Sequence, residues 1–209
     1  MVNLTPPGAE PHDVELSAGD VETVRNAEVV VFVEGFQPAL ERALGVAEGR
    51  DPHVWLSPQR MRTIALRLGD ALDREAVAAR LAEEAIALDE EYRTGLRECA
   101  RRSFVTTHAA FGWLAREFAL EQVPISGLSP EAEPTPQELK RVVQRVRASG
   151  ATTIFTEPLV SPRIAETVAR ETGAQIATLD PLEGEPAEGD YFTVMRANLA
   201  ALRKALGCR

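Results

Sequence analysis

The sequence predicts an α/β fold that contains a parallel sheet. Short apolar segments typical of strands alternate with amphipathic helical segments along the 209 residues. A hydroxyl or acidic residue stands at the capping position of several of the expected helices. Because strands that alternate with helices are joined by right-handed crossovers, we expect a parallel sheet covered by helices on both faces.

The first part of the chain begins with two expected strands and a capped helix. Extended segments at residues 2–4 and 28–33 predict the strands. Between them, Ser17 and Asp20 have the spacing of a capping box, which predicts a helix that runs to about residue 26. The alternation of strand and helix therefore starts near the beginning of the sequence.

Three further helices are expected before the middle of the chain. One covers residues 38–44, and another begins after Ser57, with Pro58 at the first helical position, where a missing N–H costs nothing. The third covers residues 75–99 and spans about 36 Å at about 1.5 Å per residue, which is long enough to bridge two lobes. Its expected apolar stripe consists of Val77, Leu81, Ala85, Leu88, Tyr92 and Leu96.

Strands and helices alternate again in the second half of the chain. Thr135 and Glu138 form a second capping box, with Pro136 at the first helical position. The expected strands cover residues 104–107, 123–126, 152–156 and 175–179, and the expected helices cover residues 109–119, 136–148, 162–172 and 191–206.

The composition predicts a folded protein without a general affinity for polyanions. Hydrophobic residues make up 44% of the chain and charged residues 26%, as in globular domains. The net charge of −9 disfavours binding to nucleic acid or to an anionic membrane surface. The longest apolar run, at residues 29–33, is far shorter than the roughly 18–20 residues that span a bilayer. The chain as given begins without the pattern of a secretory leader.

The three histidines of the chain lie at strand ends or in loops. His12 follows the first expected strand, and His53 lies in a short extended segment. His108 and Asp180 each directly follow an expected strand, and ligands of open parallel sheets bind beyond these carboxyl ends. Imidazole nitrogens and a carboxylate oxygen form a donor set that suits Zn²⁺. The sequence therefore predicts a metal site.

An alternative interpretation is that each histidine is a loop residue that only forms hydrogen bonds with its neighbours, which is a common role of this side chain. The wide spacing of the histidines forms no local ligand motif. The sequence also contains no HExxH or GxSxG motif that would supply a catalytic base or nucleophile.

Five segments, in order along the chain, together resemble the signatures of one protein family. This family comprises the zinc/manganese substrate-binding proteins of bacterial ABC uptake systems, and the resemblance is to its zinc branch. It covers essentially the whole chain. The segments are NLTPPGAEPHD at residues 3–13, DPHVWL at 51–56, TTHAAFG at 106–112, GLSPEAEP at 127–134 and LDPL at 179–182.

The resemblance implies two α/β lobes with parallel sheets flanked by helices, joined by a long rigid helix, with the metal in the cleft between them. We assign residues 1–73 to the first lobe, 74–101 to the linking helix and 102–209 to the second lobe. Family members begin with a leader, a strand and a helix that precede the equivalent of Val2. The first lobe is therefore expected to be truncated relative to the family, and the chain lacks a His-rich insertion before Asp51.

The resemblance also implies a ligand set for the metal. His12 and His53 are the expected ligands from the first lobe, and His108 and Asp180 those from the second. Manganese-type members often carry a carboxylate at the position of His108, so this histidine favours zinc over manganese. A water molecule in place of Asp180 remains an alternative for the fourth ligand. Two further acidic residues are expected to be hydrogen-bonding partners rather than ligands: Glu10 and Glu157.

The function implied by the resemblance is transport rather than catalysis. The protein is expected to be a monomer that captures Zn²⁺ outside the cytoplasm, in the periplasm or at the cell surface, and delivers it to an ABC permease without binding nucleic acid. The alternatives are a zinc-dependent hydrolase or lyase with a three-histidine site, and a truncated homologue without function.

Similar proteins often carry a disulfide at the positions of Cys99 and Cys208. A disulfide that closes a loop of about 100 residues removes roughly 4–5 kcal/mol of conformational entropy from the unfolded chain. Two separate thiols remain the alternative.

Overall fold

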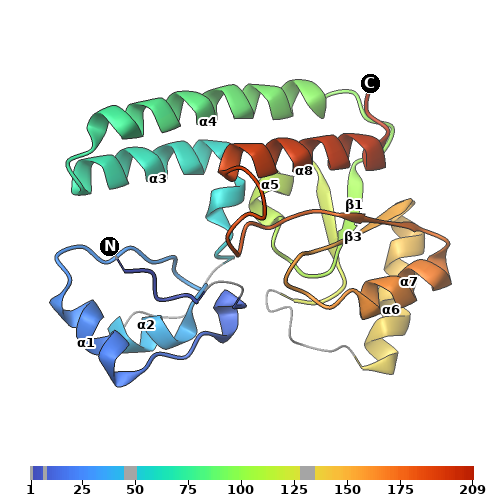
Figure 1. Cartoon of the computed structure of the whole chain (residues 1–209). Helices are drawn as coiled ribbons and strands as arrows, with labels where there is room; N and C mark the ends of the chain where they lie inside the picture. The colour runs from blue at the N-terminus through green and yellow to red at the C-terminus, as the bar shows by residue number, and fades with distance from the viewer. Residues whose placement is uncertain (1, 7–8, 45–50, 128–134) are drawn as a thin grey trace.

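Four short parallel strands form a single sheet in the second half of the chain. The computed structural model describes residues 2–6, 9–44, 51–127 and 135–209 (Figure 1). The order of strands across the sheet is β2-β1-β3-β4. The strands are β1 (Ser103–Thr106), β2 (Glu121–Pro124), β3 (Thr153–Thr156) and β4 (Gln175–Thr178).

Each face of the sheet is buried by its own apolar cluster. Phe104 of β1 and Phe155 of β3 belong to one cluster, whereas their neighbours Val105 and Ile154 belong to the other. This division follows from the alternation of side chains along a strand. Val105 pairs with Ile154 in the register, so the two strands present matching residues to each face.

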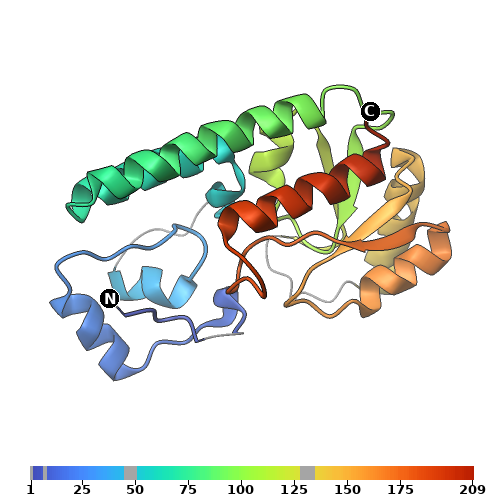
Figure 2. The ribbon, with the colours of Figure 1, turned by 45° about the horizontal axis from the view of Figure 1, so that its top comes forward.

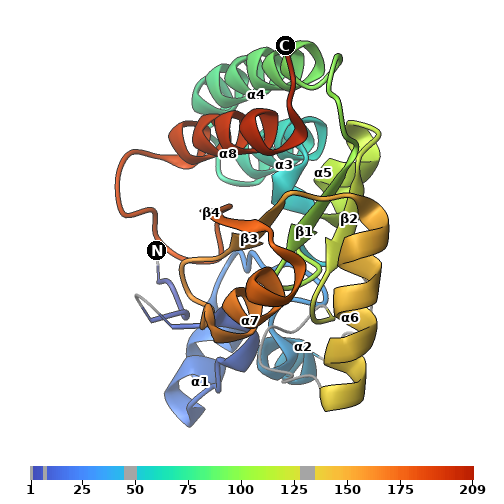
Figure 3. The ribbon, with the colours of Figure 1, turned by 90° about the vertical axis from the view of Figure 1, so that its right-hand side faces the viewer.

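Helices cover both faces of the sheet, as Figure 3 shows in a view from the side. Residues of the amphipathic helices α6 (Pro136–Ser149) and α7 (Arg163–Thr172) pack in the cluster that contains Val105. Residues of α5 (Gly112–Glu117) and α8 (Tyr191–Leu206) pack in the cluster that contains Phe104. The predicted α/β class, with a parallel sheet flanked by helices, is confirmed.

Two long helices form a hairpin that lies beside α8 (Figures 1 and 2). They are α3 (Pro58–Ala71), which is capped by Ser57 as predicted, and α4 (Glu75–Gly95). The hydroxyl of Tyr92 on α4 donates a hydrogen bond of 2.7 Å to the carbonyl oxygen of Met195 on α8. The hairpin is thereby attached to the helix that covers the sheet.

The long helix differs from its prediction in its end and in its buried face. It ends at Gly95 rather than near residue 99. Val77 and Leu81 are 43% and 39% exposed, and the face buried in this half of the helix consists of alanines. The physical reason is the close approach of α3, which leaves space only for small side chains where the two helices meet.

The first part of the chain contains helices but no strands among its described residues. Its elements are η1 (Pro11–Asp13), α1 (Ala18–Asn26), α2 (Pro38–Leu44) and η2 (Val54–Leu56). The capping box of Ser17 and Asp20 at the start of α1 is confirmed. The strands predicted at residues 2–4 and 28–33 are wrong. A strand needs ladder partners and a buried face, and Val29 and Val31 are instead 42% and 58% exposed.

The remaining elements follow the predicted order with small shifts at their ends. The largest shift concerns the helix expected over residues 109–119, since α5 begins only at Gly112 after a turn that follows His108. The second capping box, of Thr135 and Glu138, is present at the start of α6.

Cys99 and Cys208 form a disulfide, as expected from the resemblance. The bond joins the segment after α4 to the segment after α8. Backbone hydrogen bonds reinforce this junction, since Arg101 N donates to the carbonyl oxygen of Leu206 at 3.0 Å and Arg209 N donates to that of Glu98 at 3.1 Å. The ends of two long helices are thus fixed together.

No helix in the described parts of the chain has both the length and the apolar character that a membrane span requires.

The contact between α3 and α4 predicts a position that is intolerant of substitution. A Cβ atom added at Gly69 would overlap the Cβ of Ala78 on the facing helix. We expect Gly69→Ala to lower the free energy of unfolding by about 1–3 kcal/mol, because the helices must move apart. Gly19→Ala is the matched control, since this helical position is open and alanine favours a helix by up to about 1 kcal/mol. Urea unfolding measures both changes, and equal stability of the two variants would contradict the close packing.

Candidate metal centre

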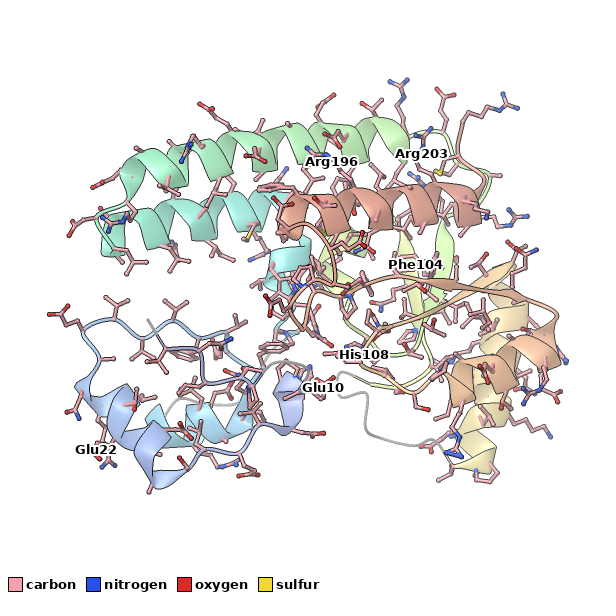
Figure 4. The ribbon with its side chains drawn as sticks, in the orientation of Figure 1. Glu10, Glu22, Phe104, His108, Arg196 and Arg203 are labelled. Carbon is pink, nitrogen blue, oxygen red and sulfur yellow. A yellow bond between two sulfur atoms is a disulfide. The ribbon has the colours of Figure 1, made fainter. Side chains whose placement is uncertain are left out.

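Four side chains from distant parts of the sequence converge on one point. They are those of His12, His53, His108 and Glu183, and each offers one ligand atom that lies within 4.8 Å of the other three. Figure 4 shows His108 and the neighbouring Glu10 at the place where the first part of the chain approaches the sheet. The structure thus brings together all three of the histidines singled out in the sequence.

His12 is presented by the short helix η1. Pro11 is buried at the start of this helix, and the carboxylate of Glu10 accepts a hydrogen bond of 3.3 Å from the backbone N–H of His12. The side chain of His12 is only 9% exposed, and its Nε2 lies 3.7 Å from Oε1 of Glu183. Glu10 therefore has the hydrogen-bonding role expected from the sequence.

Asp51 orients the ring of His53 by a hydrogen bond to Nδ1, on the side opposite Glu183. The His53 ring donates through Nδ1 to Oδ1 of Asp51 at 2.9 Å, and Nε2 lies 2.8 Å from Oε1 of Glu183. Asp51 is itself fixed by α5: Trp113 Nε1 donates to its carbonyl oxygen at 2.9 Å. Gly112 leaves room for the carboxylate, since a Cβ there would lie 2.6 Å from Oδ2 of Asp51.

His108 follows β1 and is held by a second buried carboxylate. Its backbone N–H donates to Oε1 of Glu157 at 3.2 Å, and its Nδ1 forms an ion pair with Oε2 of the same side chain. Its Nε2 lies 3.0 Å from Oε1 of Glu183. The hydroxyl of Thr107 also donates to Glu157. Glu157 thus has the role of a hydrogen-bonding partner that was expected from the sequence.

The fourth member of the group is Glu183, whereas the sequence analysis expected Asp180. Asp180 accepts a hydrogen bond of 2.7 Å from the backbone N–H of Leu182 through Oδ1. Asn198 holds the same residue by its backbone, accepting from Asp180 N at 2.9 Å and donating to Asp180 O at 2.7 Å. Asp180 therefore shapes the turn after β4, and this turn directs Glu183 to the three histidines.

Sequence reasoning missed Glu183 because it considered only the residue that directly follows the strand. Leu182 has a positive φ of 57°, which a sequence pattern does not predict for leucine. The available signal was the sequence DPLE, in which an aspartate and a proline favour a turn before the glutamate. Glu185 lies close by in the sequence, so this signal alone would not have selected Glu183.

The pairing of ring nitrogens with carboxylates requires a positive charge in the centre. A neutral imidazole has one N–H. If the single N–H of a neutral His53 is at Nδ1 and donates to Asp51, the lone pair of Nε2 faces the carboxylate of Glu183. The same holds for His108 with Glu157. Two acceptors at about 3 Å repel each other unless a proton or a metal ion lies between them.

The pKa values of His53, His108 and Glu183 are shifted in the directions that this need for positive charge predicts. Burial alone lowers the pKa of His108, but the carboxylates of Glu157 and Glu183 outweigh it and raise the pKa to about 10. The pKa of His53 is raised for the same reason by Asp51 and Glu183. Burial raises the pKa of Glu183, but the neighbouring imidazoles of His108, His12 and His53 lower it well below its usual range. The raised pKa values of His53 and His108 thus favour protonated rings at the place where a metal ion would lie.

The donor set fits a small divalent cation. His12 Nε2 and Glu183 Oε2 are buried and form no hydrogen bond with any described residue, so an ion would satisfy them. Three imidazoles and one carboxylate match the tetrahedral coordination of Zn²⁺, whose ligand atoms lie about 2 Å from the ion. No thiolate is available as a ligand, because both cysteines are in the disulfide.

Parts of the family-like segments lie outside the described residues. These are residues 7–8 of the first segment and residues 128–134 of the fourth.

The chain is similar to known zinc-uptake and zinc-binding proteins. Residues 45–205 match the model of the family described as zinc-uptake complex component A, periplasmic. The zinc-binding protein AdcA of Streptococcus pyogenes (serotype M6) is 40% identical over 167 residues, which is 73% of this chain and 32% of that protein. The high-affinity zinc uptake system protein ZnuA of Bacillus subtilis is 30% identical to this chain. The alignment covers 97% of this chain and 79% of that protein.

The fold also matches a solved structure. The Zn(II)-bound ZnuA-like domain of Streptococcus pneumoniae AdcA superposes with a TM-score of 0.77 and 32% identity, covering 97% of this chain and 89% of that domain. The chain spans about a third of the length of the first curated relative that it matches.

The chain combines a parallel α/β architecture with imidazole and carboxylate donors that converge between two of its parts, an arrangement that could hold a divalent metal ion. The family match covers most of the chain. The chain belongs to the family of zinc-uptake complex component A.

The carboxylate behind His108 predicts an unusual titration. In the ion-free protein, we expect the His108 ring to remain a positively charged imidazolium at pH 8, since its pKa is raised to about 10. Glu157→Gln removes a charged partner and should lower this pKa, whereas Glu166→Gln on the exposed side of α7 should not. Titration of the ring by NMR measures both. A His108 pKa near 6.5 in the unsubstituted protein would contradict the described contacts.

Proposed function

We propose that the protein captures Zn²⁺ outside the cytoplasm and delivers it to the permease of an ABC transporter for uptake. The observation that carries the proposal is the convergence of three imidazoles on one buried carboxylate oxygen. Two of the relatives are a zinc-binding protein and a zinc uptake system protein, which supports zinc as the transported ion. The family description as periplasmic supports the location.

The proposed ligands are His12, His53, His108 and Glu183. Asp51 and Glu157 orient two of the histidines, so that Nε2 of each points toward the ion. Carboxylate partners of this kind fix the ring orientation and raise the basicity of a metal-bound histidine. The nitrogen-rich donor set favours Zn²⁺ over Mn²⁺, which prefers oxygen ligands.

The division into lobes at residues 1–73 and 102–209, with residues 74–101 between them, is part of the proposal. His12 and His53 belong to the first segment, and His108 and Glu183 belong to the second. An ion bound by all four would therefore join the two lobes. Delivery to a permease requires that this connection be broken again, and protonation of the histidines opposes rebinding.

The alternatives account for fewer of the observations. A zinc hydrolase needs a coordination position for water, and here a fourth protein donor lies within reach of the same point as the three histidines. A homologue without function requires no carboxylates beside His53 and His108, and both histidines have one here. We therefore favour transport.

Zinc titration distinguishes Glu183 from Asp180 as the fourth ligand. We expect Glu183→Gln to weaken zinc binding by about 100-fold or more, because even residues behind a ligand contribute about 10–100-fold. Asp180→Asn is the matched control, since asparagine keeps the oxygen that accepts from Leu182 N, and it should change the affinity by less than about threefold. Competition with a chromophoric chelator measures both dissociation constants.

Equal losses in the two variants would contradict the assignment of Glu183. Absence of zinc binding by the unsubstituted chain at micromolar concentration would contradict the proposed function itself.

A further inference from the structure

An aromatic side chain that is not part of the ligand set lies against the histidines. The ring centroid of Phe36 is 4.9 Å from that of His12, with the rings at 79°, and 6.2 Å from that of His53, with the rings at 75°. Both contacts have the edge-to-face geometry that aromatic rings prefer. Phe36 therefore covers the two histidines that come from the first part of the chain.

Phe36 is positioned by a buried carboxylate in the first part of the chain. Phe36 N donates to the carbonyl oxygen of Val33 at 3.2 Å, which closes a tight turn, and Gly35 in this turn has a φ of 85°. Glu41 of α2, which is only 1% exposed, accepts a hydrogen bond from the backbone N–H of Gly35. A buried acidic residue is thus used to fix the backbone that carries the ring.

Phe36 packs against a second aromatic ring, that of Trp55, which hydrogen bonds attach to the second half of the chain. Its centroid lies 4.7 Å from that of Trp55, which in turn lies 5.3 Å from His53. Trp55 Nε1 donates to the carbonyl oxygen of Pro181 at 2.7 Å, and the hydroxyl of Tyr191 donates to the carbonyl oxygen of Trp55 at 2.7 Å. The two rings therefore form a continuous wall that reaches the turn bearing Glu183.

We propose that Phe36, supported by Trp55, is a specificity-determining residue that keeps water out of the metal centre and limits the bound ion to four ligands. This inference rests on the proposed function. The apolar ring occupies space beside His12 and His53 and offers no ligand atom to an ion. A coordination sphere without water suits Zn²⁺, which accepts four ligands. It disfavours Mn²⁺, which prefers six ligands and oxygen donors.

The wall also differs from a purely structural aromatic cluster in its position. Phe36 lies outside the two apolar clusters that stabilise the sheet. Its aromatic contacts are His12, His53 and Trp55. Its removal should therefore change the coordination of the ion more than the stability of the sheet.

Co²⁺ is the probe of this inference, because its visible d–d absorption is intense in four-coordinate sites and weak in five- or six-coordinate ones. The unsubstituted full chain with Co²⁺ should show the intense spectrum. Phe36→Ala and Phe36→Gln, which admit water, should lower the absorption per bound ion by about threefold or more. They should also reduce the preference for Zn²⁺ over Mn²⁺ by about tenfold in competition titrations.

Phe36→Leu is the matched control, since it keeps an apolar side chain and should retain the four-coordinate spectrum. Phe36→Gln keeps most of the side-chain volume, so it tests the inference even if the smaller alanine prevents folding. Four-coordinate spectra for both Phe36→Ala and Phe36→Gln would overturn the role of Phe36 while leaving zinc capture intact. Failure of the unsubstituted chain to bind either Co²⁺ or Zn²⁺ would instead overturn the proposed function, and this inference with it.

Discussion

The attraction between one buried carboxylate and three imidazoles is the constraint on which the rest of the site depends. Oε1 of Glu183 lies 2.8 Å from His53 Nε2, 3.0 Å from His108 Nε2 and 3.7 Å from His12 Nε2. An ionised carboxylate is costly to bury unless it is paired with positive charge. Protons on the histidines satisfy this condition without metal, and a divalent cation satisfies it with all four donors at once. The same geometry therefore explains the raised pKa values of His53 and His108 and supports the proposed binding of an ion.

The fold supplies this geometry from rigid elements. His108 follows β1 and the turn that bears Glu183 follows β4, so both leave the carboxyl edge of one parallel sheet, with β3 between them. Ligands of such sheets bind at this edge. His12 and His53 approach from the first part of the chain: His12 lies in the short helix η1, and His53 directly precedes the short helix η2. Hydrogen bonds from Trp113 to Asp51 and from Trp55 to Pro181 connect the two parts beside the site. The centre is thus defined by contacts between parts of the chain that are far apart in sequence.

Sequence patterns predict the secondary-structure elements that depend on local periodicity. They do not predict strand pairing or side-chain positions that depend on contacts between distant parts of the chain. The four strands of the sheet and the capping boxes at Ser17 and Thr135 follow from local signals, and so they were predictable. The segment at residues 28–33 has the composition of a strand but finds no ladder partner among the described residues. The three histidines were conspicuous because they are rare. Glu183 was not, because an acidic chain offers many carboxylates and the position of this one depends on the turn formed by Asp180 and by Leu182 with its positive φ.

The most direct test of the account is the X-ray absorption spectrum of zinc bound to the full chain at the zinc K edge. The structure predicts a first shell of three nitrogens and one oxygen at about 2.0–2.1 Å, with the outer-shell scattering of three imidazole rings and without sulfur. A shell of five or six light atoms, or scattering from fewer than three imidazoles, would contradict the convergence of these four side chains on one ion.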